Sequence, residues 1–520
     1  MQSFPIFQCL FATILLVNVT WAQHDPQRNA VRLIAAGNYD KATKEIGKGE
    51  EHYETSFVKM LLALKQGQIE TAVAHADEAL KAGMPFGRLV AGPRPDLKPL
   101  YSTDQFKKWA ADHSKLKLLH GPMLGAVTDS GASIWLRTAQ AAKVKIQVSV
   151  GDKAIETIEQ LTSDKSDFTA VFRLKKLQPS TAYDYQVVID GQTVPTKGTT
   201  IRTFAAKGEA SKFNVGFGGG AGYVPKWEYM WNTISALKPD AFLMLGDNVY
   251  IDDPTEALTN RYCYYRRQSR PEWRQFVAGT SMFAIYDDHD FGMNDCVPGP
   301  EIESPPWKRT VWNTFRQNWV NPYYGGGEKQ PGCWHDFTIG DVHFILLDGR
   351  YYRTRKPTPS MLGPVQKKWL FETLKKSKST FKVLCSPVPW TKGIKPGSRD
   401  PWDGYAEERE EVFRFIEDNR IEGLFLVAAD RHRTDLRITK RPNGYDLYEF
   451  ESSKLTNRHT HGVVKTPGLV WGYNKTCSFG WMEFDTTADD PKVQFIAITI
   501  DGERVHTAEL RRSQLRSRGN

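Results

Sequence analysis

Acidic and histidine residues stand directly after short apolar runs at three places in the chain. They are Asp247, the pair Asp288 and His289, and the pair Asp430 and His432. One such acid would be unremarkable, because Asp favours turns and helix caps. Three groups on separate strands suit a dinuclear metal site, in which a carboxylate bridges two cations and an imidazole binds metal or protonates a leaving alkoxide. Turns and caps, with His432 packed and hydrogen-bonded, are an equal alternative on these residues alone.

The runs that precede these residues predict buried strands. They are short and apolar, at 241–245, 282–286, 343–347, 382–385 and 423–427. Amphipathic stretches at 366–374 and 406–418 predict helices between them. From about residue 211 onward we therefore expect an α/β domain with one or two central sheets, in which ligand groups gather where the strands end.

The region from about residue 24 to 112 is predicted to be helical. Apolar residues recur at helical spacing around a turn at Gly37-Asn38, and the pattern returns around Gly67. This arrangement resembles tetratricopeptide-like helix pairs. About two units are fewer than a free-standing solenoid requires, so we expect the segment to pack on the rest of the protein as a structural cap, with a docking module as the alternative.

The region from about residue 116 to 205 shows strand patterning. Residues 133–137 and 144–150 mostly alternate apolar with polar side chains, and turn residues separate them. Residues 177–185 resemble the tyrosine-corner segment of fibronectin type III domains, in which a Tyr hydroxyl ties a loop to a strand. A small antiparallel β-sandwich is expected here, with a positioning or binding role.

The amino-terminal residues predict export. Residues 1–22 read as a signal peptide, with an apolar run at 9–19 and a small residue at the end, although no Lys or Arg precedes the run. This run is too short to span a bilayer comfortably, and no later segment is long enough. We therefore expect a soluble mature protein without a transmembrane segment, secreted or periplasmic.

Cysteine usage and charge add two expectations. Five cysteines follow residue 22, which allows two disulfides and one thiol without assigning them. The formal net charge of +9 comes partly from arginines in the last ten residues. A solvated tail is expected there, since a nucleic-acid binder would show a longer basic stripe. We thus expect no stable nucleic-acid complex, and the positive balance suits phosphorylated substrates. The sequence carries no signal for the oligomeric state.

Three motifs taken in order resemble those of PhoD-type phosphatases. They are Gly246-Asp247-Asn248-Val249-Tyr250, the stretch 286–294 around Asp287-Asp288-His289, and Asp430-Arg431-His432, with supporting matches at 347–353 and 362–370. That family belongs to the calcineurin-like metallophosphoesterase fold. The resemblance covers about residues 116–510. It implies a metallophosphoesterase-like β-sandwich core with flanking helices over 208–520, preceded by a small all-β fibronectin-like domain at 116–207. The helical tetratricopeptide-like segment, 23–115, lies outside it.

The resemblance also implies roles for individual residues. Asp247 would bridge both metals, Asp288 would replace a ligand Asn of the wider fold, and His289 would act as the acid. Asp430 and His432 would each serve one metal. Asn294 would be an amide ligand, and Tyr250 or Tyr265 would be a tyrosine ligand. Asn248 and Arg431 are expected to bind the substrate. Arg350, which follows a strand, is expected from its own chemistry to orient phosphate, because a guanidinium matches phosphate oxygens bidentately.

Two departures from the family pattern concern the metal centre. Where the first motif supplies an acid or a Cys, this chain has the glycine-rich run 216–222 with no ligating side chain. Where a ligand His often precedes Ser-Pro, it has Cys385, which is expected to be a buried thiol or half-cystine, with a thiolate ligand as the alternative. One metal would then bind weakly or be absent. His459 and His461 are expected to be loop histidines rather than ligands.

The activity implied is that of a secreted metal-dependent phosphatase or phosphodiesterase, an alkaline phosphatase D-like hydrolase of phosphate esters. A metal-bound hydroxide would attack phosphorus while His289 assists the leaving group. The resemblance suggests iron with calcium, and the oxygen-rich ligands also permit manganese, magnesium or zinc. The alternative is a degenerate phosphatase-fold protein that binds an anionic ligand or partner without turnover. A third possibility is hydrolysis of another ester or anhydride on the same fold.

Overall fold

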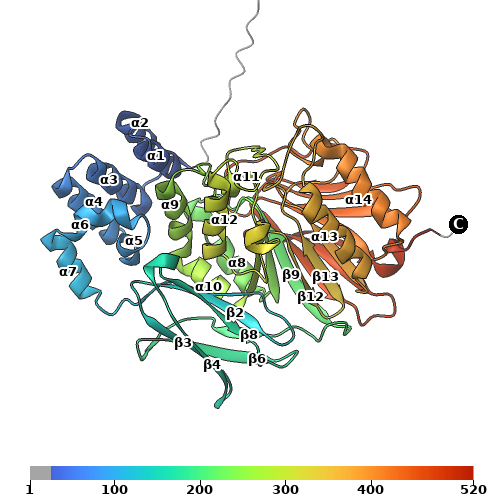
Figure 1. Cartoon of the computed structure of the whole chain (residues 1–520), viewed down its shortest axis with the longest axis horizontal. Coiled ribbons are helices and arrows are strands. Elements are labelled where there is room, and N and C mark those ends of the chain that lie inside the picture. Colours follow the sequence, from blue (N-terminus) through green and yellow to red (C-terminus); the bar gives the residue numbers. More distant parts are fainter. Residues whose placement is uncertain (1–24, 519–520) are drawn as a thin grey trace, which may run out of the picture.

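The computed structural model describes residues 25–518, so the predicted signal peptide lies outside the described residues. Two large sheets form the centre of the molecule (Figure 1). The first has the strand order β21 (Arg504–Arg511), β20 (Lys492–Thr499), β19 (Ser478–Asp485), β9 (Lys212–Gly218), β10 (Ala241–Leu245), β11 (Ser281–Ile285), β1 (Leu118–Gly125), β2 (Ala132–Thr138) and β5 (Thr169–Leu174). Strands β9, β10 and β11 run parallel, which places the ends of β10 and β11 at the same edge.

The second sheet packs face to face on the first. Its order is β12 (His335–Ile339), β13 (Val342–Leu346), β14 (Phe381–Cys385), β15 (Leu424–Ala428), β17 (Leu447–Ser452), β16 (Thr434–Thr439) and β18 (Leu469–Tyr473). Aromatic pairs join the two sheets: the rings of Phe450 and Phe495 lie 4.5 Å apart, and those of Phe344 and Phe484 lie 5.8 Å apart. The core is therefore a β-sandwich, and the expectation of a mixed α/β fold is confirmed.

Helices cover the outer faces of this sandwich. Helices α13 (Gly363–Lys376) and α14 (Ala406–Asp418) lie on one side in Figure 1, close to the predicted positions. The others of this domain are α8 (Met230–Ala236), α9 (Ala257–Gln268), α10 (Pro271–Gly279), α11 (Asp288–Phe291) and α12 (Trp307–Asn318). No helix among residues 25–518 is long and apolar enough to cross a membrane. The five cysteines described by the structure, Cys263, Cys296, Cys333, Cys385 and Cys477, are all free thiols.

The region 116–207 differs from the self-contained sandwich expected for it. Strands β1, β2 and β5 extend the nine-stranded sheet, and β1 pairs in parallel with β11 at Gly125 and Met282. The reason is burial: every residue of β1 and β2 is buried, so these strands lack an exposed face. The remaining strands, β3 (Lys143–Val150), β4 (Lys153–Leu161), β6 (Ala182–Ile189), β7 (Gln192–Val194) and β8 (Thr200–Arg202), form a separate sheet.

One local feature of that region is as expected. The Tyr183 hydroxyl accepts a hydrogen bond of 2.7 Å from the backbone N–H of Gln178, so the ring ties the preceding loop to β6. The assignment of the region to the fibronectin class stays a prediction.

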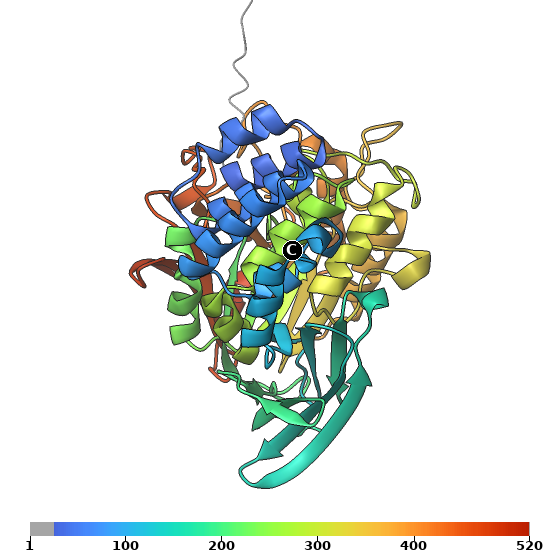
Figure 2. The same ribbon diagram turned by 90° about the vertical axis from the view of Figure 1, so that its left-hand side faces the viewer.

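Helices fill the amino-terminal segment. They are α1 (Pro26–Ala35), α2 (Tyr39–Ile46), α3 (Tyr53–Lys65), α4 (Ile69–Lys81), α5 (Gly87–Val90), α6 (Arg94–Tyr101) and α7 (Asp104–Asp112). The turns of the first two pairs contain Gly37 and Gly67, at φ 73° and 74°, which favours glycine. Figure 1 shows these helices together at one side of the molecule, and Figure 2 turns that side toward the viewer. Helix α1 packs against α9. The segment thus packs on the rest of the protein, and its tetratricopeptide class stays a prediction.

Candidate metal centre

Asp247 lies just beyond the buried end of β10. Gly246 has φ 103°, and a Cβ there would stand 2.6 Å from the Cβ of Asp287, so only glycine lets the two strand ends approach this closely. Asp247 itself has φ 53° and is buried. Its Oδ2 accepts a hydrogen bond of 3.0 Å from the Tyr250 hydroxyl, whereas Oδ1 is buried with no hydrogen-bond partner. A buried carboxylate oxygen of this kind suits a cation.

Asp288 and His289 begin helix α11, directly after β11. Ligand atoms of Asp247, Asp288 and His289 all lie within 4.8 Å of one another. Burial, together with the nearby carboxylates, raises the pKa of Asp247 well above its usual range, and a bound cation would oppose that effect. The parallel pairing of β10 with β11 therefore produces the acidic cluster that the strand-end pattern predicted.

Asp288 also belongs to a second acidic group. Its Oδ2 accepts the backbone N–H of Asp295 at 2.6 Å, and ligand atoms of Asp288, Asp295 and Asp400 lie within 4.8 Å of one another. The Lys395 ammonium stands 3.1 Å from Asp295. Neither Asp295 nor Asp400 was among the predicted site residues. Asn294, which was predicted as a ligand, is an exposed residue of this loop, and its neighbour Asp295 is the one that faces Asp288.

His289 is held by a carboxylate. Its Nδ1 is hydrogen-bonded to Asp252, and Asp252 is in turn paired with the guanidinium of Arg28 on α1. Burial alone would lower the pKa of His289, but the carboxylates of Asp252, Asp288 and Asp247 raise it well above its usual value. Asp252 was not predicted, although it stands only two residues after Tyr250.

Tyr250, rather than Tyr265, lies beside Asp247 and His432. Its hydroxyl lies 2.7 Å from His432 Nε2, so it joins Asp247 to His432, and its ring stacks on that of His289 at 4.5 Å. The prediction of Tyr265 as an alternative is not supported by its position. Helix α9 turns the Tyr265 ring toward β2, where the Arg137 guanidinium lies 4.2 Å from the ring centroid.

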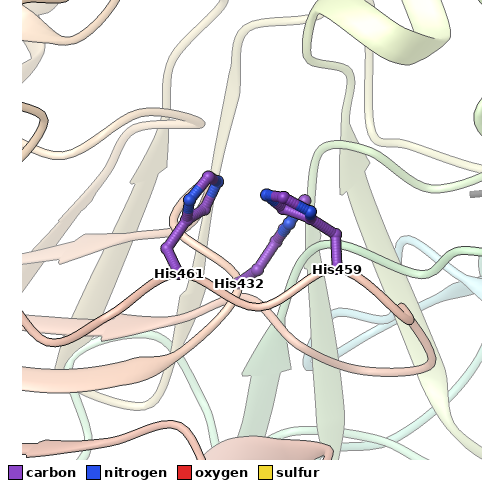
Figure 3. A group of neighbouring side chains, drawn as sticks. All are labelled: His432, His459 and His461. Atoms are coloured by element: carbon purple, nitrogen blue, oxygen red, sulfur yellow. The ribbon is translucent and has the colours of Figure 1, made fainter. Parts of the chain in front are cut away.

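His432 stands beside two further histidines. It follows β15 in a loop where Asp430 and His432 have φ 76° and 46°, and its Nε2 lies 3.9 Å from Asp247 Oδ2. Ligand atoms of His432, His459 and His461 lie within 4.8 Å of one another, and Figure 3 shows the three side chains gathered together. Burial and the Arg431 charge lower the pKa of His459 and His461, that of His461 to about 3. His459 and His461 lie in a loop, as expected, but beside His432; that they are not ligands stays a prediction.

Arg431 offers unsatisfied donors at this site. Its side chain is buried, and Nε and Nη1 have no hydrogen-bond partner, while Nη1 lies 3.5 Å from Asp430 Oδ2. A buried guanidinium with free donors suits the oxygens of a phosphate. Asp430 Oδ2 is likewise buried without a hydrogen-bond partner.

Arg350 and Asn248 are engaged by protein groups instead. The Arg350 guanidinium is fully buried, bonded to Asp287 and bidentate to Asp400 at 2.7 and 3.1 Å. The Asn248 Nδ2 donates to the Ile285 carbonyl and to Asp290. These contacts hold both side chains beneath the strand ends, and Asn248 Oδ1 is left buried without a hydrogen-bond partner. A contact of either residue with phosphate stays a prediction.

The glycine-rich run is a packing feature, not an anion cradle. The backbone amides of Gly219, Gly220 and Ala221 donate to the carbonyls of Ser452, Gly246 and Asp247. A Cβ at Gly220 would lie 2.1 Å from the Ser453 carbonyl oxygen. Cys385 is a fully buried thiol whose pKa burial raises, which agrees with the core-thiol interpretation.

Comparison with known proteins gives the same fold. Residues 215–465 match the family model described as PhoD-like phosphatase, and residues 115–206 match a domain of unknown function, DUF7800. Alkaline phosphatase D of Bacillus subtilis (strain 168) is 24% identical over 265 residues, which are 44% of this chain and 44% of that protein. The match therefore spans less than half the length of that relative.

A solved structure titled "Structure of PhoD" superposes with a TM-score of 0.65 at 17% identity, covering 78% of this chain and 92% of that one. At this identity the likeness shows the fold. The family-model match and the Bacillus subtilis relative support assignment of residues 215–465 to the PhoD-type phosphatase family.

Proposed function

We propose that this protein is a secreted, metal-dependent hydrolase of phosphate monoesters or diesters. The observation that carries the proposal is the convergence of Asp247, Asp288 and His289 within 4.8 Å at the ends of two parallel strands. The family assignment of residues 215–465 supports the same activity. Export is inferred from the signal-peptide pattern of residues 1–22, which lie outside the described structure.

The donor set fits divalent or trivalent cations. Asp247 and Asp430 each leave a buried carboxylate oxygen without a hydrogen-bond partner, and His432 lies 3.9 Å from Asp247. Asp247, Asp288, Asp430 and His432 would hold the metals, with iron and calcium as the proposed pair. Bound metals would supply positive charge for the phosphate oxygens and lower the pKa of a water nucleophile.

Other side chains of the chain would bind and protonate the substrate. Arg431 presents its free Nε and Nη1 to a phosphate beside Asp430, where two charge-assisted hydrogen bonds fix its orientation. His289 would donate a proton to the leaving oxygen, and Asp252 orients its ring through the bond to Nδ1. The Tyr250 hydroxyl would hold the side chains of Asp247 and His432 next to each other through its contacts with both.

Chelation and reconstitution test this proposal. Purified protein is assayed with bis(p-nitrophenyl) phosphate and p-nitrophenyl phosphate before and after chelator treatment, and after addition of iron, calcium, manganese, magnesium or zinc. We expect turnover that disappears with the metal and returns with at least one ion set. No rate above background under any metal condition would instead favour an anion-binding protein without turnover.

A further inference from the structure

The loop that follows β17 carries two histidines to the edge of the metal centre. His459 and His461 are half-buried and two residues apart, and their ring centroids lie 4.3 Å from each other. Each ring centroid lies 5.3 Å from that of His432, which comes from a different loop. Three imidazoles from two separate loops therefore meet at one place (Figure 3).

The protein holds this loop firmly. Asn457 Oδ1 accepts the backbone N–H of His459 at 2.9 Å, and Asn457 Nδ2 donates to the Tyr250 hydroxyl at 2.5 Å. The His461 carbonyl accepts from Asn474 Nδ2 at 3.1 Å. These bonds fix both ends of the 459–461 stretch, which is what an arranged ligand set requires.

The same loop is seated on the glycine-rich run. The backbone N–H groups of Leu455 and Thr456 donate to the carbonyls of Gly219 and Gly220 at 3.2 and 3.4 Å. A Cβ at Gly220 would lie 3.2 Å from His432 Cδ2 as well as against the Ser453 carbonyl. The absence of side chains from this run therefore makes room for the segment that brings His459 and His461 to the site.

We propose that His432, His459 and His461 form an imidazole site for a transition metal such as zinc, with His459 and His461 replacing the ligand that the glycine run lacks. Imidazole nitrogens suit zinc, copper, iron and nickel, whereas carboxylates suit calcium, magnesium and manganese. The centre would then have a nitrogen-rich half at this trio and an oxygen-rich half at Asp247 and Asp288. This inference rests on the proposed function at one point, because His432 is a metal ligand in both proposals.

The donor spacing is close to what such an ion needs. Ligand atoms of the trio lie within 4.8 Å of one another, and a tetrahedral zinc with Zn–N bonds of about 2.0–2.1 Å places its nitrogens about 3.4 Å apart. Small ring rotations of the two half-buried side chains would close the remaining gap. Water or a phosphate oxygen would complete the coordination.

Zinc binding to the full-length protein tests the site. Zinc affinity is measured by competition with a colorimetric chelator in excess calcium, and cobalt substitution is followed by visible absorption. For His459→Gln, His461→Gln and the double variant we expect zinc affinity to fall, by more than about 100-fold in the double variant, since losing outer partners alone costs about 10–100-fold. The cobalt spectrum should change as well. His75→Gln, a change at a half-buried histidine of α4 that is paired with Glu78, is the matched control.

The outcomes separate this inference from the proposed function. Unchanged zinc affinity and cobalt spectrum in a folded double variant would overturn the histidine site, whatever the hydrolytic activity. Zinc binding that depends on His459 and His461 in a protein without any hydrolysis would sustain the site and contradict the proposed function. If the double variant fails to fold, the two single variants decide the question by the same measurements.

Discussion

The guanidinium of Arg28 donates to the carboxylate of Asp252, 224 residues later in the chain. The Arg28 side chain is 4% exposed and that of Asp252 is 13% exposed, so the ion pair is shielded from solvent. Asp252 also holds His289 Nδ1. The first helix of the amino-terminal segment thereby reaches the proposed acid of the catalytic domain, although neither family-model match includes this segment.

Replacing Arg28 should weaken proton donation. We expect Arg28→Gln to lower kcat about tenfold for phenyl phosphate esters, because the general acid matters most for poor leaving groups. The rate with p-nitrophenyl esters, which need less protonation, should fall much less. Arg28→Lys should recover part of the loss. The control is Arg32→Gln, a half-buried residue on the same helix that lies 3.7 Å from Asp253. Equal losses with both leaving groups would rule out this positioning role.

Replacing the Tyr250 hydroxyl should weaken metal binding. Tyr250→Phe removes the group that contacts Asp247 at 3.0 Å and His432 at 2.7 Å. Loss of one such partner typically costs about 10–100-fold in metal affinity. Tyr265→Phe, whose ring packs against Arg137, should leave metal content unchanged. Metal analysis after dialysis checks both variants, and the opposite ranking would restore Tyr265 as the ligand.

Replacing Arg431 should weaken phosphate binding without harming the fold. Arg431→Gln removes a buried charge whose Nε and Nη1 have no hydrogen-bond partner. We expect KM and the inhibition constant of inorganic phosphate to rise about 10–100-fold, which corresponds to a charged hydrogen bond of about 1.5–3 kcal/mol. Arg458→Gln, which breaks a partly exposed pair with Glu50, is the control. An unchanged phosphate inhibition constant would remove Arg431 from the site.

Attachment of the amino-terminal segment should be acid-sensitive. Burial would raise the pKa of Asp25, but Arg266, whose Nη1 lies 3.0 Å away, and Arg28 lower it below the usual 3.8. A lowered carboxyl pKa adds stability that is present above pH 3.8 and lost as the pH falls through the folded-state value. Unfolding of the wild type followed by circular dichroism should therefore show a loss of stability below about pH 4.

Asp25→Asn should be less stable at neutral pH by about 3–5 kcal/mol, because it leaves Arg266 buried without its partner. Its stability should also change less between pH 4 and pH 2 than that of the wild type. The same acid dependence in both proteins would show that the pair does not govern attachment.

Local sequence signals were sufficient for two of the acidic residues of the site. Asp247 and Asp288 could be predicted because each ends a buried strand, and parallel strands bring such ends to one edge. The contacts of Asp252 with Arg28, and of His459 with His432, depend on segments far apart in the chain. The spacing of apolar residues along the sequence does not indicate contacts of this kind.

The sequence also did not indicate which sheet a strand would join. Strand β2 was expected to alternate between core and solvent at residues 133–137, but both faces of β2 and of its neighbour β1 are covered. A mostly apolar run of seven or eight residues is compatible with either environment, because burial is decided by the neighbouring elements. The partners of Arg350 could not be predicted for the same reason. A guanidinium after a strand suits phosphate, but in the structure Arg350 is hydrogen-bonded to Asp287 and Asp400.

The central claim is that Asp247 binds the metal on which turnover depends. The decisive measurement is kcat of Asp247→Asn with bis(p-nitrophenyl) phosphate, together with metal content, beside Asp184→Asn, an exposed change on β6. The account predicts a folded Asp247→Asn protein with reduced metal and kcat lowered at least about 100-fold, and a control like the wild type. Wild-type turnover and metal content in Asp247→Asn would contradict it.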